Sequence, residues 1–161
     1  MSDQARIHEV WTAARSRLGA TRRVELGRIG QQQLDRFAVA VDGSVADDVV
    51  GLAAPLFLSS VLVWDNGPLE RDLLPDGNAA DPFSGFDVAG LRLMAGGQEL
   101  TFHRDLEAGA LVSLDIALAG AELKTTANGP LLVLTVQRTY SDEDGPLSEC
   151  RETFLGREAL S

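Results

Sequence analysis

The sequence predicts an α+β domain in which helices come first and antiparallel strands follow. In the first half of the chain, apolar residues recur about every 3.6 positions, the spacing of one helix face. From Leu91 onward apolar and polar residues alternate, the spacing of a strand with one buried face. Helices followed by strands are typical of the α+β class. The 161 residues, 45% of them hydrophobic, suffice for one core, so we expect a single domain over residues 1–161.

The first predicted helix lies within residues 1–20, an N-terminal helical extension of the domain. Asp3 is placed to cap this helix, and Gly19 follows its last turn. The residues spaced to form its apolar face are Ile7, Val10, Trp11, Ala14 and Leu18. A short strand over residues 21–26 is expected to follow.

Two further helices are predicted before the main strands begin. The segment "QQQLDRFAVAVDG", residues 31–43, ends in Gly43, a residue typical of helix C-termini. Its predicted apolar face consists of Leu34, Phe37, Ala38 and Val41. The segment "GLAAPLFLSSVLVW", residues 51–64, is apolar on nearly all sides, which predicts a helix surrounded by protein with Pro55 in its first turn.

Residues 65–90 are predicted to form a long loop, because they are rich in Gly, Pro, Asp and Asn. One helical turn is expected within it, at residues 69–74. Loops of this length in a compact domain often serve as lids or binding loops.

The remainder of the chain has the alternation of an antiparallel meander. The residues expected on the buried face include Leu100, Phe102, Leu114, Ile116, Leu118, Leu132, Leu134 and Val136. The strands are separated by the turn sequences "EAGA", "TANGP" and "SDEDGP", and "LSECRETFLG" is expected to form the last strand.

Composition argues against several classes of function. A net charge of −10 disfavours binding to nucleic acid or to anionic membranes. The single cysteine, Cys150, excludes an internal disulfide and a cysteine-based zinc cluster, and we expect no bound metal. The N-terminal stretch lacks an apolar signal region, so a cytoplasmic location is expected.

Five segments resemble the MaoC-like hydratase and dehydratase group, most closely its FAS1-like dehydratase, or MaoC N-terminal, branch. They are "QLDRFAVAVDG" (33–43), "LAAPLFLSSVL" (52–62), "GGQELTFHRDLEAGALV" (96–112), "NGPLLVLTVQRTYSDEDGPL" (128–147) and "ETFLGRE" (152–158). The likeness extends to the non-catalytic subunits of mycobacterial-type heterodimeric (3R)-hydroxyacyl dehydratases. It implies a hot-dog fold, in which a long central apolar helix is wrapped by an antiparallel sheet.

The resemblance also implies chemistry on an acyl thioester of coenzyme A or acyl carrier protein, to which water is added or from which it is removed. Catalytic members carry a Gly-Asp-x-Asn-Pro-hydrophobic-His motif after the helix that ends here in "FAVAV", and its Asp and His move the protons. The corresponding stretch, "VDGSVADDVVG", retains Asp42 but has no histidine. Asp47 and Asp48 are better interpreted as solvated turn residues. We therefore expect no complete catalytic pair in this chain, with Asp42 and His103 as weak candidates.

His103 lies in the phrase "FHRDLEAG", on the strand face opposite Leu100 and Phe102. A structural role, bonding a neighbouring strand or a partner subunit, is favoured over catalysis, because a lone histidine lacks a placed base or water. The family phrase commonly has proline where this chain has Asp105.

Substrate contacts are expected from Ala54, Pro55, Leu56 and Phe57, because the resemblance places the start of the central helix against the acyl tunnel. A purely structural role for Pro55 and Phe57 is an equal alternative. Gly96 and Gly97 are further candidates, and the loop around residues 76–85 is a candidate cover for the tunnel.

Two functions are compatible with these features. In the favoured one, the chain is the substrate-shaping, catalytically degenerate subunit of an (R)-specific enoyl-thioester hydratase or 3-hydroxyacyl-thioester dehydratase, paired with a catalytic MaoC-like hot-dog subunit. In the alternative, it is a self-sufficient homodimeric hot-dog thioesterase or a non-enzymatic acyl-thioester binding module. Neither function needs a cofactor beyond the thioester substrate.

Overall fold

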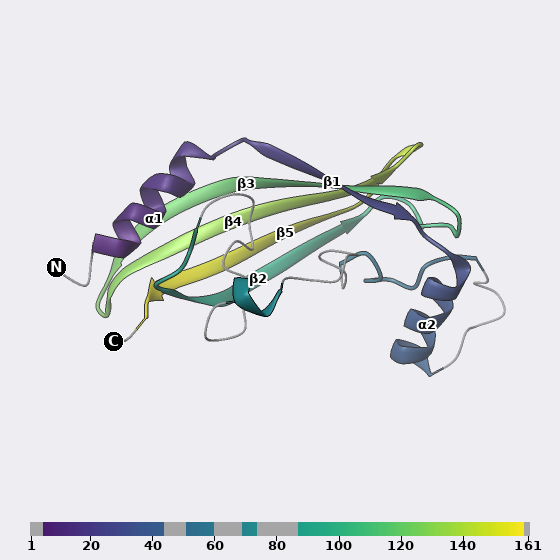
Figure 1. The fold of residues 1–161 in the computed structure, drawn as a ribbon, viewed down its shortest axis with the longest axis horizontal. Helices are drawn as coiled ribbons and strands as arrows, with labels where there is room; N and C mark the ends of the chain where they lie inside the picture. The colour runs from purple at the N-terminus through teal and green to yellow at the C-terminus, as the bar shows by residue number, and fades with distance from the viewer. Residues whose placement is uncertain (1–4, 44–50, 60–68, 74–86, 160–161) are drawn as a thin grey trace.

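The computed structural model describes residues 5–43, 51–59, 69–73 and 87–159 and confirms the α+β class. The elements are α1 (Ala5–Ser16), β1 (Thr21–Arg28), α2 (Gln31–Asp42), the short 3₁₀ helix η2 (Glu70–Asp72), β2 (Leu91–Phe102), β3 (Leu111–Thr126), β4 (Gly129–Asp142) and β5 (Gly145–Glu158). In Figure 1, α1 lies against one end of a long sheet and α2 lies beyond the other end.

The five strands form one antiparallel sheet in the order β1-β3-β4-β5-β2. The predicted meander is confirmed for β3, β4 and β5, with the sequences "TANGP" and "SDEDGP" as its two turns, but β2 pairs with β5 instead of with β3. Gly129 and Gly145 lie within these turn sequences and have φ values of 92° and 117°, which L side chains rarely adopt. Strands β1 and β2 are therefore the two edges of the sheet in the described part of the chain.

The hydrophobic core lies on one face of the sheet, here called the core face. It carries every second residue of β4, including Leu132, Leu134 and Val136, each fully buried as predicted. Helix α1 packs on this sheet through Ile7, Val10 and Ala14. Trp11 of α1 also donates a hydrogen bond from Nε1 to the Ala121 carbonyl oxygen of β3, at 3.3 Å. Leu18 is 43% exposed because the helix ends before it.

A charged pair interrupts the core face near the middle of the sheet. Arg138 of β4 is 4% exposed and forms an ion pair with Glu152 of β5. The Gln98 side-chain amide on β2 donates to Glu152 Oε1 at 3.3 Å and to Cys150 Sγ at 3.1 Å. Burial lowers the pKa of Arg138 from its usual value and raises the pKa of Tyr140, its neighbour on the same face, to about 12.

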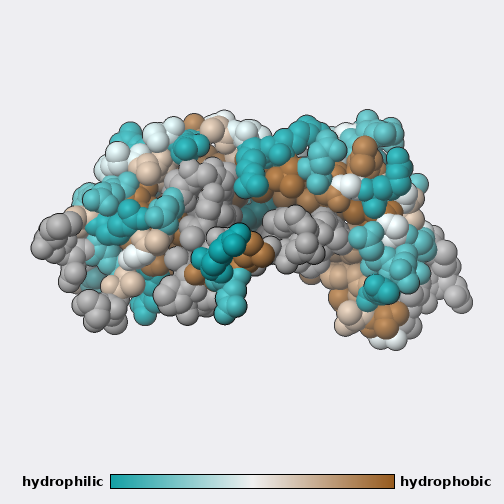
Figure 2. Space-filling view, viewed as in Figure 1, coloured by the Kyte–Doolittle hydropathy of each residue, from teal (hydrophilic) through white to brown (hydrophobic). Residues whose placement is uncertain are grey.

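Helix α2 confirms the second predicted helix and ends as expected. Gly43 takes a left-handed conformation, with φ of 76°, and its N–H donates to the Val39 carbonyl oxygen. Leu34 is buried, whereas Val39 and Val41 are 51% and 59% exposed. Figure 2 shows the corresponding apolar surface at the lower right, where Figure 1 places α2.

The predicted helix over residues 51–64 is wrong wherever the structure describes it. Residues 51–59 form turns and an isolated antiparallel bridge between Leu52 and Glu107. Two of their backbone hydrogen bonds join a distant segment: Ala53 N donates to Leu106 O, and Ala108 N donates to Gly51 O, both at 2.8 Å. Residues 60–64 lie outside the described part.

The predicted loop 65–90 is described only at residues 69–73 and 87–90. Helix η2 falls within the helical turn expected at residues 69–74. Asp3, Asp47, Asp48 and the candidate cover at residues 76–85 lie outside the described residues. In the part of the chain that is described, no helix has the length and apolar character to cross a membrane.

Candidate functional site

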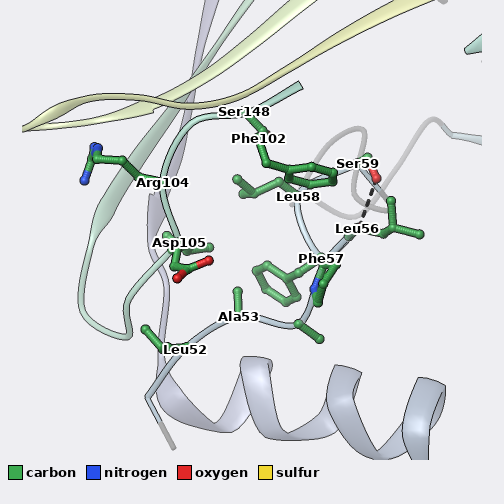
Figure 3. A pocket seen from close by; sticks show the side chains of 13 residues that line it. Leu52, Ala53, Leu56, Phe57, Leu58, Ser59, Phe102, Arg104, Asp105 and Ser148 are labelled. Atoms are coloured by element: carbon green, nitrogen blue, oxygen red, sulfur yellow. Dashed lines mark hydrogen bonds between the residues drawn. The ribbon is translucent and has the colours of Figure 1, made fainter. Parts of the chain in front are cut away.

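A cavity of about 490 Å³ lies between the segment 51–59 and the end of β2. Figure 3 shows its walls. It is lined by Leu52, Ala53, Ala54, Pro55, Leu56, Phe57, Leu58, Ser59, Phe102, Arg104, Asp105, Leu106 and Ser148. The volume is within the range of about 300–1,000 Å³ that small-molecule sites occupy, and the lining is mostly apolar, as such sites usually are.

Aromatic packing fixes one wall of the cavity against α2. Phe57 is 2% exposed, and its ring meets that of Phe37 edge to face, with centroids 5.4 Å apart and planes at 82°. Leu58, also buried, lies beside the ring of Phe102 in Figure 3. This wall joins α2 to the end of β2, although the two elements are far apart in sequence.

The turn that carries Leu56 is conformationally strained. Leu56 has φ of 71°, the one positive φ of a non-glycine residue in the described ranges. The left-handed region is unfavourable for leucine, so surrounding contacts must hold it there. One such contact is the hydrogen bond that Ser59 Oγ donates to the Leu56 carbonyl oxygen, at 3.1 Å. The Leu56 side chain is 49% exposed at the edge of the cavity.

Two charged residues line the cavity, and they are held differently. Arg104 forms an ion pair with Asp142 and donates to the Gly145 carbonyl oxygen at 3.1 Å. Its guanidinium points away from the cavity in Figure 3. Asp105 has no hydrogen-bond or ion-pair partner among the described residues, and its carboxylate faces the cavity on the side opposite Phe57 (Figure 3).

Four predicted substrate-contacting residues, Ala54, Pro55, Leu56 and Phe57, line this cavity, and their contact with substrate stays a prediction. Gly96 and Gly97 are not among its lining residues. They lie at a bulge in β2, where a Cβ at Gly96 would come within 3.1 Å of side-chain atoms of Leu155 and Thr153. Glycine there allows β2 to pack closely on β5.

His103 contacts the neighbouring strand. Its Nε2 lies 3.4 Å from Glu149 Oε1, and its backbone N–H donates to the Leu147 carbonyl oxygen at 2.9 Å. His103 does not line the cavity, whereas Phe102, one residue earlier, does. The contact with β5 is the kind that a structural role requires.

The other weak catalytic candidate, Asp42, is the last residue of α2. Its side chain lies outside the described part of the structure, as do residues 44–50 of the motif-like stretch. A catalytic role for Asp42 therefore stays a weak candidate from the sequence, without a structural test.

Sequence reasoning missed the second wall of the cavity, formed by Arg104, Asp105, Leu106 and Ser148. Ser148 pairs with Phe102 of β2 and with Tyr140 of β4, a register that a single sequence does not reveal. The available signal was Asp105 itself, a charged residue where the family phrase commonly has proline. Within the described residues, no group of three or more His, Cys, Asp or Glu side chains could hold a metal ion.

Comparison with known proteins identifies the family. Residues 27–147 match the family described as "FAS1-like, dehydratase domain region". No match was found among curated protein sequences.

Three solved structures illustrate the fold. A chain of the ChsH1-ChsH2 complex from Mycobacterium tuberculosis is 19% identical with a TM-score of 0.69, covering 96% of this chain and 93% of that one. A hot-dog-like protein from Thermanaerovibrio acidaminovorans is 9% identical with a TM-score of 0.55, over 88% and 84%. A MaoC-like dehydratase from Rhodospirillum rubrum is 11% identical with a TM-score of 0.56, over 89% and 96%. The chain has the hot-dog fold and belongs to the FAS1-like dehydratase domain family.

Proposed function

We propose that this chain is the substrate-shaping, catalytically degenerate subunit of an (R)-specific enoyl-thioester hydratase or 3-hydroxyacyl-thioester dehydratase, and that a MaoC-like hot-dog partner performs the proton transfers. The observation that carries the proposal is a preformed apolar cavity whose titratable lining residues, within the described part of the chain, are Arg104 and Asp105. Among those lining residues there is no histidine, and so no Asp/His pair.

The chemistry of dehydration supports a partner chain as the source of the proton-transferring groups. Dehydration of a 3-hydroxyacyl thioester removes a proton from the α-carbon and delivers one to the departing hydroxyl, so it needs a base and an acid placed together. His103 is paired with Glu149 on a neighbouring strand and does not line the cavity. A partner chain that carries both groups would complete the site.

The part left to this chain is to bind the acyl group and exclude water from it. Phe57, Leu58 and Leu106 are buried residues of the cavity wall, and burying an apolar chain against them is favourable. An acyl chain held there would present its thioester to groups supplied from the partner subunit.

Association with a second hot-dog subunit is supported by the edge strands of the sheet and by a solved structure with a similar fold. Strands β1 and β2 each pair with one described strand, so each has an edge through which a second sheet could add. The chain from Mycobacterium tuberculosis, which has a similar fold over nearly its whole length, comes from a complex of two named components.

The phosphate groups of the acyl carrier, whether coenzyme A or acyl carrier protein, fit poorly on this chain's surface beside the cavity. A depression next to it, which shares Arg104 and Asp105 with the cavity, is lined by five acidic and two basic side chains. Because this rim would repel phosphate groups, we assign their binding to the partner subunit, whether the carrier is coenzyme A or acyl carrier protein.

The test is hydration of crotonyl-CoA and of a longer enoyl-CoA by the purified chain, alone and mixed with the MaoC-like protein encoded nearest to it. The proposal predicts no turnover by this chain alone, and a substrate range in the mixture that differs from that of the partner alone. Hydration by this chain alone would contradict it. Release of free thiol instead of hydration would favour the thioesterase alternative.

A further inference from the structure

Asp105 is an exposed residue that places a carboxylate on the wall of an apolar cavity. The adjacent residue, Arg104, does not pair with Asp105. It forms an ion pair with Asp142 and donates a hydrogen bond to the Gly145 carbonyl oxygen. Asp105 itself has no partner in the described part of the chain, and its carboxylate faces the cavity (Figure 3). An ionised carboxylate is only an acceptor of hydrogen bonds, so a ligand group that meets it must be a donor.

The acidic residues around Asp105 limit which ligand group can donate this hydrogen bond. The depression on its other side is lined by Glu107, Asp142, Glu143 and Asp144 as well as by two arginines, Arg28 and Arg104. Arg28 donates to the Gly109 carbonyl oxygen, and Arg104 is paired with Asp142. An anionic ligand group would be repelled at this rim, whereas a neutral hydroxyl would not.

We propose that Asp105 accepts a hydrogen bond from the 3-hydroxyl group of the bound acyl chain, so that this cavity selects hydroxyacyl thioesters over enoyl and saturated ones. The inference rests on the proposed function, because it assumes an acyl thioester as ligand. It adds that this chain, although it carries no catalytic pair, distinguishes the hydrated form of the substrate from the dehydrated form.

The test compares neutral N-acetylcysteamine thioesters of equal chain length, which remove the carrier's charge from the measurement. The 3-hydroxyacyl, enoyl and saturated thioesters are titrated by calorimetry into the full chain and into the variants Asp105→Ala and Asp105→Asn. Glu107→Gln is the matched control, since Glu107 lines the neighbouring depression and not the cavity. Circular dichroism verifies that each variant is folded.

For the wild-type chain we expect the hydroxyacyl ligand to bind about tenfold more tightly than the saturated one, the low end for a hydrogen bond to a charged acceptor that is open to water. Asp105→Ala should remove this preference. Asp105→Asn, which keeps an acceptor but loses the charge, should keep part of the preference. Glu107→Gln should behave as the wild type.

The outcomes separate this inference from the function on which it rests. Equal binding of the hydroxyacyl, enoyl and saturated ligands to the wild type, or a preference that survives Asp105→Ala, would overturn the role of Asp105 and leave the acyl site in place. Failure of the wild type to bind any of the ligands would overturn both the acyl site and the role of Asp105.

Discussion

At the scale of single residues, Leu56 stores strain beside the cavity. Its φ of 71° is accessible to glycine at little cost but is unfavourable for residues with a Cβ. We predict that Leu56→Gly is more stable than Leu56→Ala by about 0.5–1 kcal/mol, which is the strain relieved less the entropy cost of glycine. Urea denaturation of the two variants measures the difference, and equal stability would show that the turn is not strained.

Tyr140 gives a second prediction at this scale, because it is the single tyrosine of the chain. Burial raises its pKa to about 12, with a smaller opposing effect from Arg138. The raised pKa means that the folded state holds the phenol proton at a pH where the unfolded state, with a pKa of about 10, releases it. This contribution to stability is therefore complete below pH 10 and is lost as the pH rises toward about 12.

The ultraviolet absorbance of the ionised phenol reports this titration directly. The folded chain should ionise close to the raised value and the urea-unfolded chain close to pH 10. Coincident titrations of the folded and unfolded chain would mean that Tyr140 is open to water.

At the scale of elements, the buried pair Arg138–Glu152 joins β4 to β5. Side chains of the pair are 5% and 16% exposed, so removing one charge leaves the other in a weakly hydrated environment. We predict that Glu152→Leu lowers the free energy of unfolding by about 3–5 kcal/mol, and that the double variant Arg138→Met/Glu152→Leu recovers most of that loss. If the double variant is as unstable as the single one, the pair contributes more than charge compensation.

The elements also show what sequence can and cannot predict. The long strands were predictable, because burial of one face imposes strict alternation on residues such as Leu114, Leu118 and Leu134. The segment 51–59 was not, because an apolar composition indicates burial without fixing the backbone. Its conformation depends on backbone hydrogen bonds with Leu106 and Ala108, which lie in a distant part of the chain.

One wall of the candidate site could be predicted from the sequence and the opposite wall could not. The wall formed by residues 54–57 was predicted, although from a helix that the structure does not contain there. The opposite wall, with Asp105 and Ser148, depends on the pairing of β2 with β5. Strand register between distant segments is a tertiary property that one sequence leaves open.

At the scale of the whole molecule, the net charge of −10 bears on the carrier of the substrate. Acyl carrier proteins are acidic, so we predict that this chain alone does not bind one, even at low ionic strength where attraction between opposite charges is strongest. Analytical gel filtration of the two proteins together checks this. A complex that forms at low salt and dissociates at high salt would place a carrier-binding surface on this chain.

The central claim is that this chain shapes the substrate site without moving protons. The most direct measurement is enoyl-CoA hydration by the partner mixed with the double variant Asp42→Asn/His103→Gln, compared with the partner mixed with the wild-type chain. We expect turnover within about twofold of the wild-type mixture, because both residues are assigned no part in the proton transfers. Loss of about a hundredfold or more, the size expected for removing a general acid or base, would contradict the claim.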